Sequence, residues 1–451
     1  MTTMHERPAT SDLLRPGDDG YDAARAPWAA NVDQRPAAVA TPTDAAGVVA
    51  TVRAAAGLGL RVAPQGTGHN AHPLPALDDV LLLRTTRMTE VTVDPVRRIA
   101  RAESGAIWMD AVVPAGRHGL VPLHGSSPDV GIAGYSLGGG MGWYARKHGL
   151  QTNHLTAVEL VTADGDLVRA DAGHETDLFW ALRGGGGNFG VVTALEFDLF
   201  PVETAYAGML VWDWRHAGRV LARFAEWAPE QPDEVTTSFR ILQLPPIPEV
   251  PEAVRGRQIV MINGAVLADD ATAEQILAPL RELAPEIDTF GRVPAPSLIR
   301  LHLDPEGPTP AISSTAMLGA LPPSGVDALV EAAGPGSGTS LLIAAELRQL
   351  GGALGRPHPG AGALPMLDGQ FALFSLGLPM APGDAERIGA DLARVRTAMA
   401  PYANGRQYLN FMEERADAGH GFDPHNWARL RELRRRYDPT GVFVANHEIP
   451  V

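Results

Sequence analysis

Three glycine-rich segments within residues 64–190 constrain the fold of this chain more than any other feature. They are 64–70 (PQGTGHN), 125–142 (GSSPDVGIAGYSLGGGMG) and 183–190 (RGGGGNFG). Glycine lets the backbone N–H groups of a loop turn toward an anion or lie against a flat ligand. The first segment lacks the G-x-G-x-x-G spacing of the dinucleotide-binding fingerprint. Each segment alone suits an ordinary loop, but three on one continuous stretch predict an extended cofactor.

Composition and charge exclude several other kinds of protein. The 451 residues suffice for two or three domains, and the absence of cysteine excludes disulfides, thiolate metal sites and cysteine nucleophiles. A net charge of −15 makes nucleic acid a poor partner. We find no secretory signal, no stretch near the roughly 18 apolar residues that span a bilayer, and no metal-binding motif. We therefore expect a cytoplasmic protein without a metal, a membrane or a nucleic-acid partner.

Residues 31–203 are predicted to form an α+β unit. Asp44 can cap the first helix, and the dipeptide Asp164-Gly165 supplies the positive φ that a tight hairpin requires. The expected helices are 44–56, 107–118 and 177–183, and the expected strands are 61–64, 80–84, 90–94, 97–103, 155–163, 166–169 and 190–199.

A second α+β unit is predicted after Pro201. Its expected strands are 234–242, 257–266, 340–348 and 369–377, and its expected helices are 270–284 and 383–400. The basic run 429–436 is expected to lie on a helix and to point its charges into solvent. Residues 1–30 are polar and read as an N-terminal arm without a chemical role.

The order of the glycine-rich segments resembles the FAD-binding domain of the vanillyl-alcohol oxidase and para-cresol methylhydroxylase (PCMH) superfamily. The stretches 408–411 (YLNF) and 426–449 (NWARLRELRRRYDPTGVFVANHEI) are similar to the terminal signature of its berberine bridge enzyme-like branch. The resemblance implies a two-subdomain PCMH-type FAD-binding domain at 31–203 and a substrate domain at 204–404 with an antiparallel sheet covered by helices. A C-terminal segment at 405–451 would return to the FAD-binding domain.

The resemblance also assigns residues to the cofactor. His69 stands where relatives join a histidine covalently to the flavin 8α-methyl group, whereas His72 does not fit the pattern. Ser127 replaces a cysteine that makes a second flavin bond in many members, so only one bond is expected, and Tyr135 replaces a common histidine. The full expected FAD site is Gln65, Gly66, Thr67, Gly68, His69, Asn70, Ser127, Val130, Gly131, Gly134, Tyr135, Gly138, Gly142, Asn188, Gly190, Val192 and Asn446.

Candidate substrate residues follow partly from the resemblance and partly from strand alternation. Tyr408 matches a tyrosine at the flavin face and is the candidate catalytic base, and Asn410 and Gln370 are candidate substrate residues. Alternation could also bring one or two of Glu346, Arg348 and Gln349 over the flavin. An ordinary exposed strand face explains those three residues, and Gln370, equally well.

The activity implied by the resemblance is oxidation by FAD. Hydride would pass from an alcohol or amine carbon of a small molecule, such as a sugar, an alkaloid-like amine or a secondary metabolite, to covalently bound FAD and then to molecular oxygen. Tyr408 would act as the base for an alcohol and would only orient an amine. Two alternatives stay open at this point: a reductase of the same fold that uses NADPH, and a flavin-binding protein without turnover.

Overall fold

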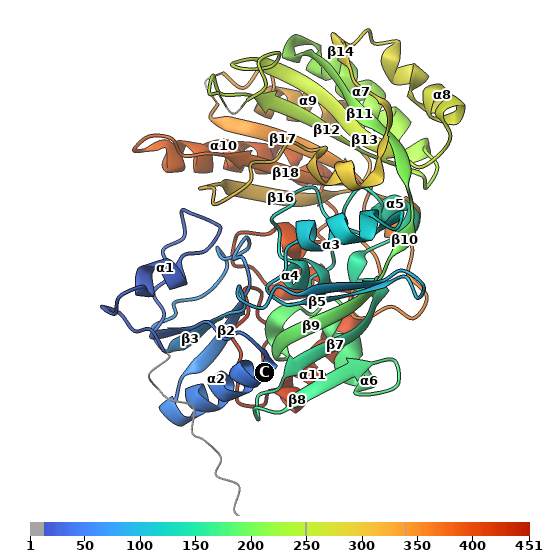
Figure 1. The fold of residues 1–451 in the computed structure, drawn as a ribbon. Coiled ribbons are helices and arrows are strands. Elements are labelled where there is room, and N and C mark those ends of the chain that lie inside the picture. Colours follow the sequence, from blue (N-terminus) through green and yellow to red (C-terminus); the bar gives the residue numbers. More distant parts are fainter. Residues whose placement is uncertain (1–12, 249, 339) are drawn as a thin grey trace, which may run out of the picture.

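Four β-sheets organise the part of the chain that the computed structural model describes, which is residues 13–451 except 249 and 339. Three of them lie in the lower half of Figure 1, and the largest lies in the upper half. The molecule is an α+β protein, as the sequence predicts. The last strand of the lower half ends at Pro201 and the first strand of the upper sheet begins at Thr204. The domain boundaries at 203 and 404 stay predictions.

The first sheet is parallel, and its middle strand is buried on both sides. Val80–Arg84 is buried at all five positions, which is typical of a parallel strand covered on two faces. Helix α2, Ala45–Leu58, packs against this sheet and begins as predicted, because the Asp44 side chain accepts a hydrogen bond from Gly47 N. The sheet has the order β1-β3-β2, with strands Ala38–Ala40, Val80–Arg84 and Arg61–Gln65.

The second sheet is antiparallel and has the order β4-β5-β9-β7-β8. Its predicted hairpin is confirmed, since Gly165 has a φ of 77° and joins β7 to β8. The strands are Val91–Asp94, Ile99–Glu103, Val191–Asp198, Leu155–Val161 and Leu167–Asp171. The helices beside it are α3 Trp108–Gly116, α4 Ile132–Leu137, α5 Ala145–His148 and α6 Thr176–Leu182. A short pair, β6 Leu120–Val121 and β10 Phe200–Pro201, completes this half.

The upper sheet has eight strands in the order β14-β11-β13-β12-β17-β18-β16, with β15 also paired to β11. Its strands are β11 Thr204–Asp213, β12 Val235–Gln243, β13 Gln258–Val266, β14 Ile287–Asp288, β15 Gly291–Pro294, β16 Ile312–Leu318, β17 Leu342–Gln349 and β18 Phe371–Gly377. Its helices are α7 Ala217–Trp227, α8 Asp270–Arg281, α9 Pro323–Ala333 and α10 Asp384–Met399. Strands β11 and β16 and helices α7 and α9 were not predicted.

The two faces of this sheet differ in character. Phe239, Leu347 and Phe371 lie on one face and pack in the same apolar core as the four helices. The opposite face is polar, because Ser238 pairs with Arg348, and Arg240 pairs with Glu346, across β12 and β17. Strand alternation therefore directs buried polar side chains away from the helices and toward the lower half.

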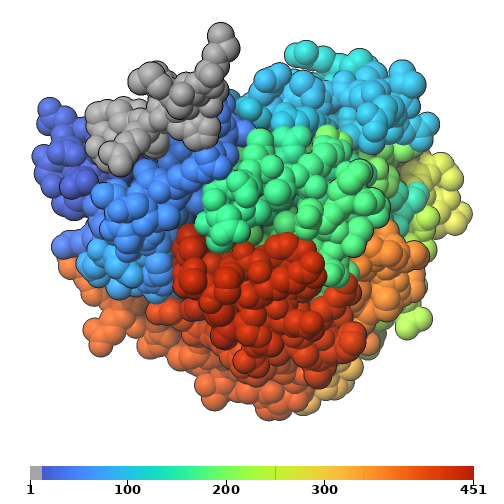
Figure 2. Space-filling view, turned by 90° about the horizontal axis from the view of Figure 1, so that it is seen from below, coloured from blue at the N-terminus to red at the C-terminus, as the bar shows by residue number. Residues whose placement is uncertain are grey.

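The C-terminal segment returns to the lower half of the molecule. Helix α11, Pro424–Tyr437, contacts α6, and residues 442–444 add to the edge of β2 through Val62 N to Val442 O, 2.8 Å, and Val444 N to Val62 O, 2.9 Å. Figure 2 shows this red segment against both the blue and the green parts of the chain. The expectation that 429–436 points only into solvent is wrong at Arg434, which is 1% exposed and paired with Asp438.

Residues 13–30 are packed rather than forming a free arm; residues 1–12 of the predicted arm lie outside the described part. Helix α1, Tyr21–Arg25, buries its tyrosine, whose hydroxyl donates to Pro36 O. Trp28 N donates to Thr67 O at 2.9 Å, which joins this region to the first glycine-rich segment. In the described residues, no helix has the length and apolar character that a membrane span requires.

Candidate active site

His69 lies at the end of the first glycine-rich segment, which follows β2 directly. The Trp28 indole stacks on its imidazole with ring centroids 4.0 Å apart and planes 17° apart. On the ring edge, Nδ1 lies 2.8 Å from Thr67 Oγ1, and Nε2 lies 3.6 Å from Asp129 Oδ1. Nε2 is buried and has no hydrogen-bond partner among the described residues. The ring is therefore held in one orientation while one nitrogen stays unpaired.

Asp129 belongs to the second glycine-rich segment and faces His69. Its Oδ2 accepts from Trp28 Nε1 and Gly307 N, both at 2.7 Å, and its Oδ1 accepts from Ser127 Oγ at 2.9 Å. Burial alone would raise the pKa of Asp129, but His69, Gly307 N and Trp28 outweigh it and hold that pKa well below its usual range. The hydroxyl of Ser127 is thus engaged with a carboxylate that is ionised at neutral pH.

The loops present polar groups that suit a large anionic ligand. Among the described residues, no protein acceptor pairs with the backbone N–H groups of 66–70, 126–127 or 129–131. Several buried side-chain atoms also have no hydrogen-bond partner in the described part of the chain: His69 Nε2, Asn70 Oδ1, Ser136 Oγ, Thr152 Oγ1 and both amide atoms of Gln151. Buried polar groups are rarely left unpaired, so these groups fit the phosphates and polar ring edges of FAD.

The glycines of the second segment differ in how closely other protein atoms approach them. A Cβ at Gly142 would lie 1.8 Å from the backbone oxygen of His124, so protein contacts alone require glycine there; one at Gly138 would lie 1.9 Å from Asn410 Oδ1 and would displace that side chain. At Gly134 a Cβ would meet no described atom within 4 Å. Val130 and Gly131 sit beside Thr67 and α3, since Trp108 N donates to Val130 O and a Cβ at Gly131 would approach Thr67.

Tyr408 lies beneath this segment and is 1% exposed. Its hydroxyl accepts from Gly140 N at 2.9 Å and from Asn410 Nδ2 at 3.3 Å. Burial raises the pKa of Tyr408 to about 12, although both hydrogen bonds and the charge of Arg348 oppose that rise. Tyr135 is half-buried; its hydroxyl donates to Leu123 O at 3.2 Å, and the loss of solvent around that hydroxyl raises its pKa too.

The third glycine-rich segment is tied to the C-terminal segment. Asn188 is 2% exposed; its Nδ2 donates to Gly185 O and His447 O, and its Oδ1 accepts from Ile449 N. Gly190, at φ 159°, and Val192 continue into β9. Asn446 reaches back to Asn70 O at 3.5 Å. The structure therefore brings the first and third segments together through residues 446–449.

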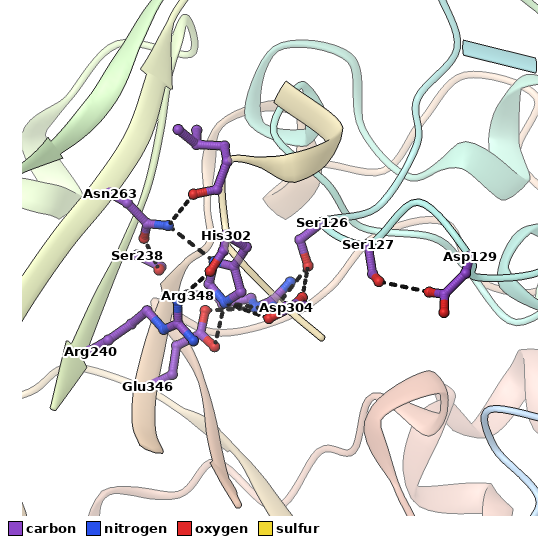
Figure 3. A network of polar contacts seen from close by, with 11 residues as sticks. Ser126, Ser127, Asp129, Ser238, Arg240, Asn263, His302, Asp304, Glu346 and Arg348 are labelled. Carbon is purple, nitrogen blue, oxygen red and sulfur yellow. Dashed lines mark hydrogen bonds and ion pairs between the residues drawn. The ribbon is translucent and has the colours of Figure 1, made fainter. Parts of the chain in front are cut away.

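A buried polar network occupies the face of the upper sheet that points toward these loops (Figure 3). Ser238 Oγ donates to Asn263 Oδ1 at 2.7 Å, so Asn263 Nδ2 is the atom that donates to His302 Nδ1 at 3.1 Å. His302 Nδ1 must then be the acceptor, and Nε2 carries the proton that it donates to Glu346 Oε2 at 3.1 Å. The chain of bonds ends on a carboxylate.

Charge in this network is balanced by arginine. Arg348 Nε lies 2.8 Å from Glu346 Oε1, and Arg348 Nη2 lies 3.4 Å from Ser126 Oγ of the second glycine-rich segment. Burial would raise the pKa of Glu346, but Arg348, the contact with His302 and the charge of Arg240 together outweigh it and keep that pKa below its usual range. Burial, reinforced by Arg240, lowers the pKa of His302. At neutral pH Glu346 is therefore ionised and His302 is neutral.

Phe411 connects Tyr408 to the sheet. Its ring lies 4.9 Å from the Tyr408 ring, and the Arg348 guanidinium carbon lies 5.0 Å from its centroid. The sequence left open which residues of strand β17 lie toward the flavin site; in the structure, Glu346 and Arg348 face the glycine-rich loops. Gln349 points the other way, where its Oε1 accepts from Thr237. Gln370 precedes β18 with an exposed side chain, and its role toward substrate stays a prediction.

The comparisons with known proteins agree with this geometry. Residues 36–171 match the family model of an FAD binding domain, and residues 407–450 match the berberine and berberine-like model. Among related proteins, (R)-6-hydroxynicotine oxidase of Paenarthrobacter nicotinovorans is 33% identical over 48% of this chain and 44% of its own length. Xylooligosaccharide oxidase of Thermothelomyces thermophilus is 37% identical over 39% of this chain and 37% of its own. The chain thus spans less than half the length of either of these two relatives.

The solved structures extend the agreement in fold to the whole chain. The 6-hydroxy-D-nicotine oxidase of Arthrobacter nicotinovorans superposes with a TM-score of 0.81 over 96% of both chains, at 24% identity. The first two glycine-rich segments lie within the region that matches the FAD binding domain, which makes these loops the candidate FAD site. The C-terminal segment is similar to berberine and berberine-like proteins, so the chain resembles FAD-linked oxidases of that kind in both matched regions.

Several residues at the site carry no signal in the sequence. Ser238, Asn263 and His302 come from three separate elements, and Trp28 stands 41 residues before its stacking partner. Asp129 lies in a segment that was singled out, yet only the fold shows that it faces His69. No group of three or more metal-ligating side chains occurs in residues 13–451 apart from the two undescribed positions.

Proposed function

We propose that this chain is an oxidase that uses FAD to remove hydride from a CH–OH or CH–NH carbon of a small molecule. The observation that supports this proposal most strongly is that Tyr408, Phe411 and Arg348 contact one another between the second glycine-rich segment and the polar sheet face. The two relatives named above are oxidases, by name one of hydroxynicotine and one of xylooligosaccharides, which supports both kinds of carbon. Bound FAD would supply the acceptor of two electrons and their transfer to oxygen.

The protein side chains orient the substrate and handle its proton. Arg348 and Glu346 offer a donor and an ionised acceptor for polar groups of the substrate, and the ring of Phe411 lies next to both Arg348 and Tyr408. Tyr408 takes the proton of a substrate hydroxyl in its phenolate form, and the N–H of Gly140 and the amide of Asn410 stabilise that phenolate before the proton arrives. With a neutral amine substrate, Tyr408 only orients the nitrogen.

The test is bleaching of the flavin absorbance without air. A panel of 6-hydroxynicotine and xylo-, gluco- and chitooligosaccharides is mixed with the holoenzyme, and oxygen is then admitted while hydrogen peroxide is measured. Bleaching by a panel member, followed by peroxide, is the expected result. Bleaching only by NADPH would establish the reductase alternative, and bleaching by neither would favour a binding protein.

We also propose that one covalent bond joins FAD to His69 and that Ser127 makes none. The fixed ring of His69 at the end of the first glycine-rich segment supports this attachment, and the hydroxyl of Ser127 is engaged with Asp129. After acid precipitation, the wild-type chain should keep its fluorescent flavin, and the variant His69→Ala should release it. Free FAD from the wild type, or flavin found on His72 by mass spectrometry, would refute the assignment.

A further inference from the structure

The carboxylate of Asp129 is the feature of this site that the proposed oxidation does not use. It is not needed as a partner for a cation, because no arginine or lysine is paired with it among the described residues. Instead, three hydrogen-bond donors fix its two oxygens: Trp28 Nε1, Gly307 N and Ser127 Oγ. With these contacts made, Oδ1 points toward His69 Nε2 at 3.6 Å.

The imidazole of His69 is oriented to complement that carboxylate. Thr67 Oγ1 lies 2.8 Å from Nδ1, and a hydroxyl can donate its proton to an unprotonated ring nitrogen. The proton of the neutral ring then resides on Nε2, on the side of Asp129. The stacked Trp28 prevents the ring from turning over, so both nitrogens keep these assignments.

We infer that Asp129 is the positioning residue that activates His69 for attachment of FAD, by accepting the Nε2 proton while Nδ1, once its hydrogen bond to Thr67 is broken, forms the new bond. This inference rests on the proposed covalent bond. A neighbouring base that removes the second proton of an imidazole makes the first nitrogen a stronger nucleophile. Ser127 contributes indirectly. It stands where many relatives have a cysteine that binds the flavin, and here its hydroxyl holds the carboxylate of Asp129, which activates His69.

The attachment reaction balances with dioxygen as the oxidant. One C–H bond of the flavin 8α-methyl group and the N–H bond of His69 break, and one bond forms between the 8α carbon and Nδ1. Two protons and two electrons leave in the process; Asp129 receives the imidazole proton and passes it to water. The two electrons pass to dioxygen, and with two protons they yield hydrogen peroxide.

The experiment follows attachment itself rather than turnover. The full chain is produced under riboflavin limitation and mixed with FAD, and samples are quenched in acid at intervals to measure protein-bound flavin. The variants are Asp129→Asn, Asp129→Glu and, as a matched control, Asp166→Asn, whose carboxylate is exposed and paired with Arg53 at 3.3 Å. Absorbance of the native, unquenched samples reports non-covalent FAD binding separately.

We expect Asp129→Asn to bind FAD and to attach it about 10²-fold more slowly or worse, as is typical when a general base is lost. Its rate should rise with pH as hydroxide replaces the carboxylate, whereas the wild-type and Asp166→Asn rates should not, and Asp129→Glu should recover part of the rate. NMR of the isolated flavin peptide should place the bond on Nδ1.

Three results would overturn the inference: attachment by Asp129→Asn at the wild-type rate, the same pH profile in the variant and the wild type, or a bond on Nε2. If Asp129→Asn cannot bind FAD, Asp129→Glu and the bonded nitrogen decide the question in the same way. A wild-type chain that never holds FAD covalently would refute the proposed bond instead, and the wild-type sample alone reveals that outcome.

Discussion

Replacement of Tyr408 by phenylalanine tests the proposed base directly. The ring of Tyr408 is buried against Phe411, so Tyr408→Phe removes one hydroxyl and keeps the packing. With a pKa of about 12, only about one Tyr408 in 10⁴ is ionised at pH 8, and this fraction rises tenfold for each pH unit. If Tyr408 is the base for an alcohol, the wild-type rate of flavin reduction should rise with pH.

The expected losses follow from the contacts of the hydroxyl. Without it, reduction by an alcohol substrate should slow by about 10² to 10⁴ and lose its dependence on pH. Gly140 N would also lose its acceptor, which should cost about 1–3 kcal/mol of unfolding free energy, whereas Asn410 Nδ2 would keep Tyr135 O as an acceptor at 3.0 Å.

The measurement is stopped-flow bleaching of the flavin from pH 6 to pH 10. Tyr144→Phe is the matched control, because Tyr144 is equally buried and its hydroxyl bonds only Ala295 O, at 3.0 Å, among the described residues. An unchanged rate in Tyr408→Phe, or a wild-type rate that is flat with pH, would remove Tyr408 from the chemistry. Glu346, which is already ionised at neutral pH, would then be the stronger candidate.

Three further predictions concern stability and oxygen. Arg434→Met should lower the unfolding free energy in urea by about 3–5 kcal/mol, because Asp438 at 0% exposure loses its partner, and adding Asp438→Asn should restore part of the loss. Burial lowers the pKa of His124 from 6.5 to about 4. Between these pH values His124 is protonated in the unfolded chain but stays neutral in the folded chain. The unfolding free energy should therefore fall by about 3 kcal/mol from pH 6.5 to pH 4. His124→Gln should reduce that slope, and an equal slope would contradict the reasoning. The resemblance implies that a small side chain at Val130 admits oxygen, so Val130→Leu should slow reoxidation of the reduced flavin in air, and unchanged reoxidation would count against the role.

Local patterns in the sequence were sufficient for the elements whose signals are local. The cap at Asp44, the hairpin at Gly165 and the apolar run 80–84 all lie where they were predicted, because a few neighbouring residues determine them. Strands β11 and β16 were missed, since their stability comes from partners far along the chain. The network around His302 was missed for the same reason: strand register and a distant loop assemble it.

The pairing of β2 with residues 442–444 has a consequence during synthesis of the chain. The edge of β2 at Val62 cannot form its pairing with Phe443 until that residue has left the ribosome, 381 residues later. At about 5–20 residues per second, that delay is on the order of 20–80 s. An exposed strand edge of this kind is a site of wrong pairing. Nascent chains should therefore depend on chaperones during this interval, and FAD added during translation should protect them only after the C-terminal segment has emerged.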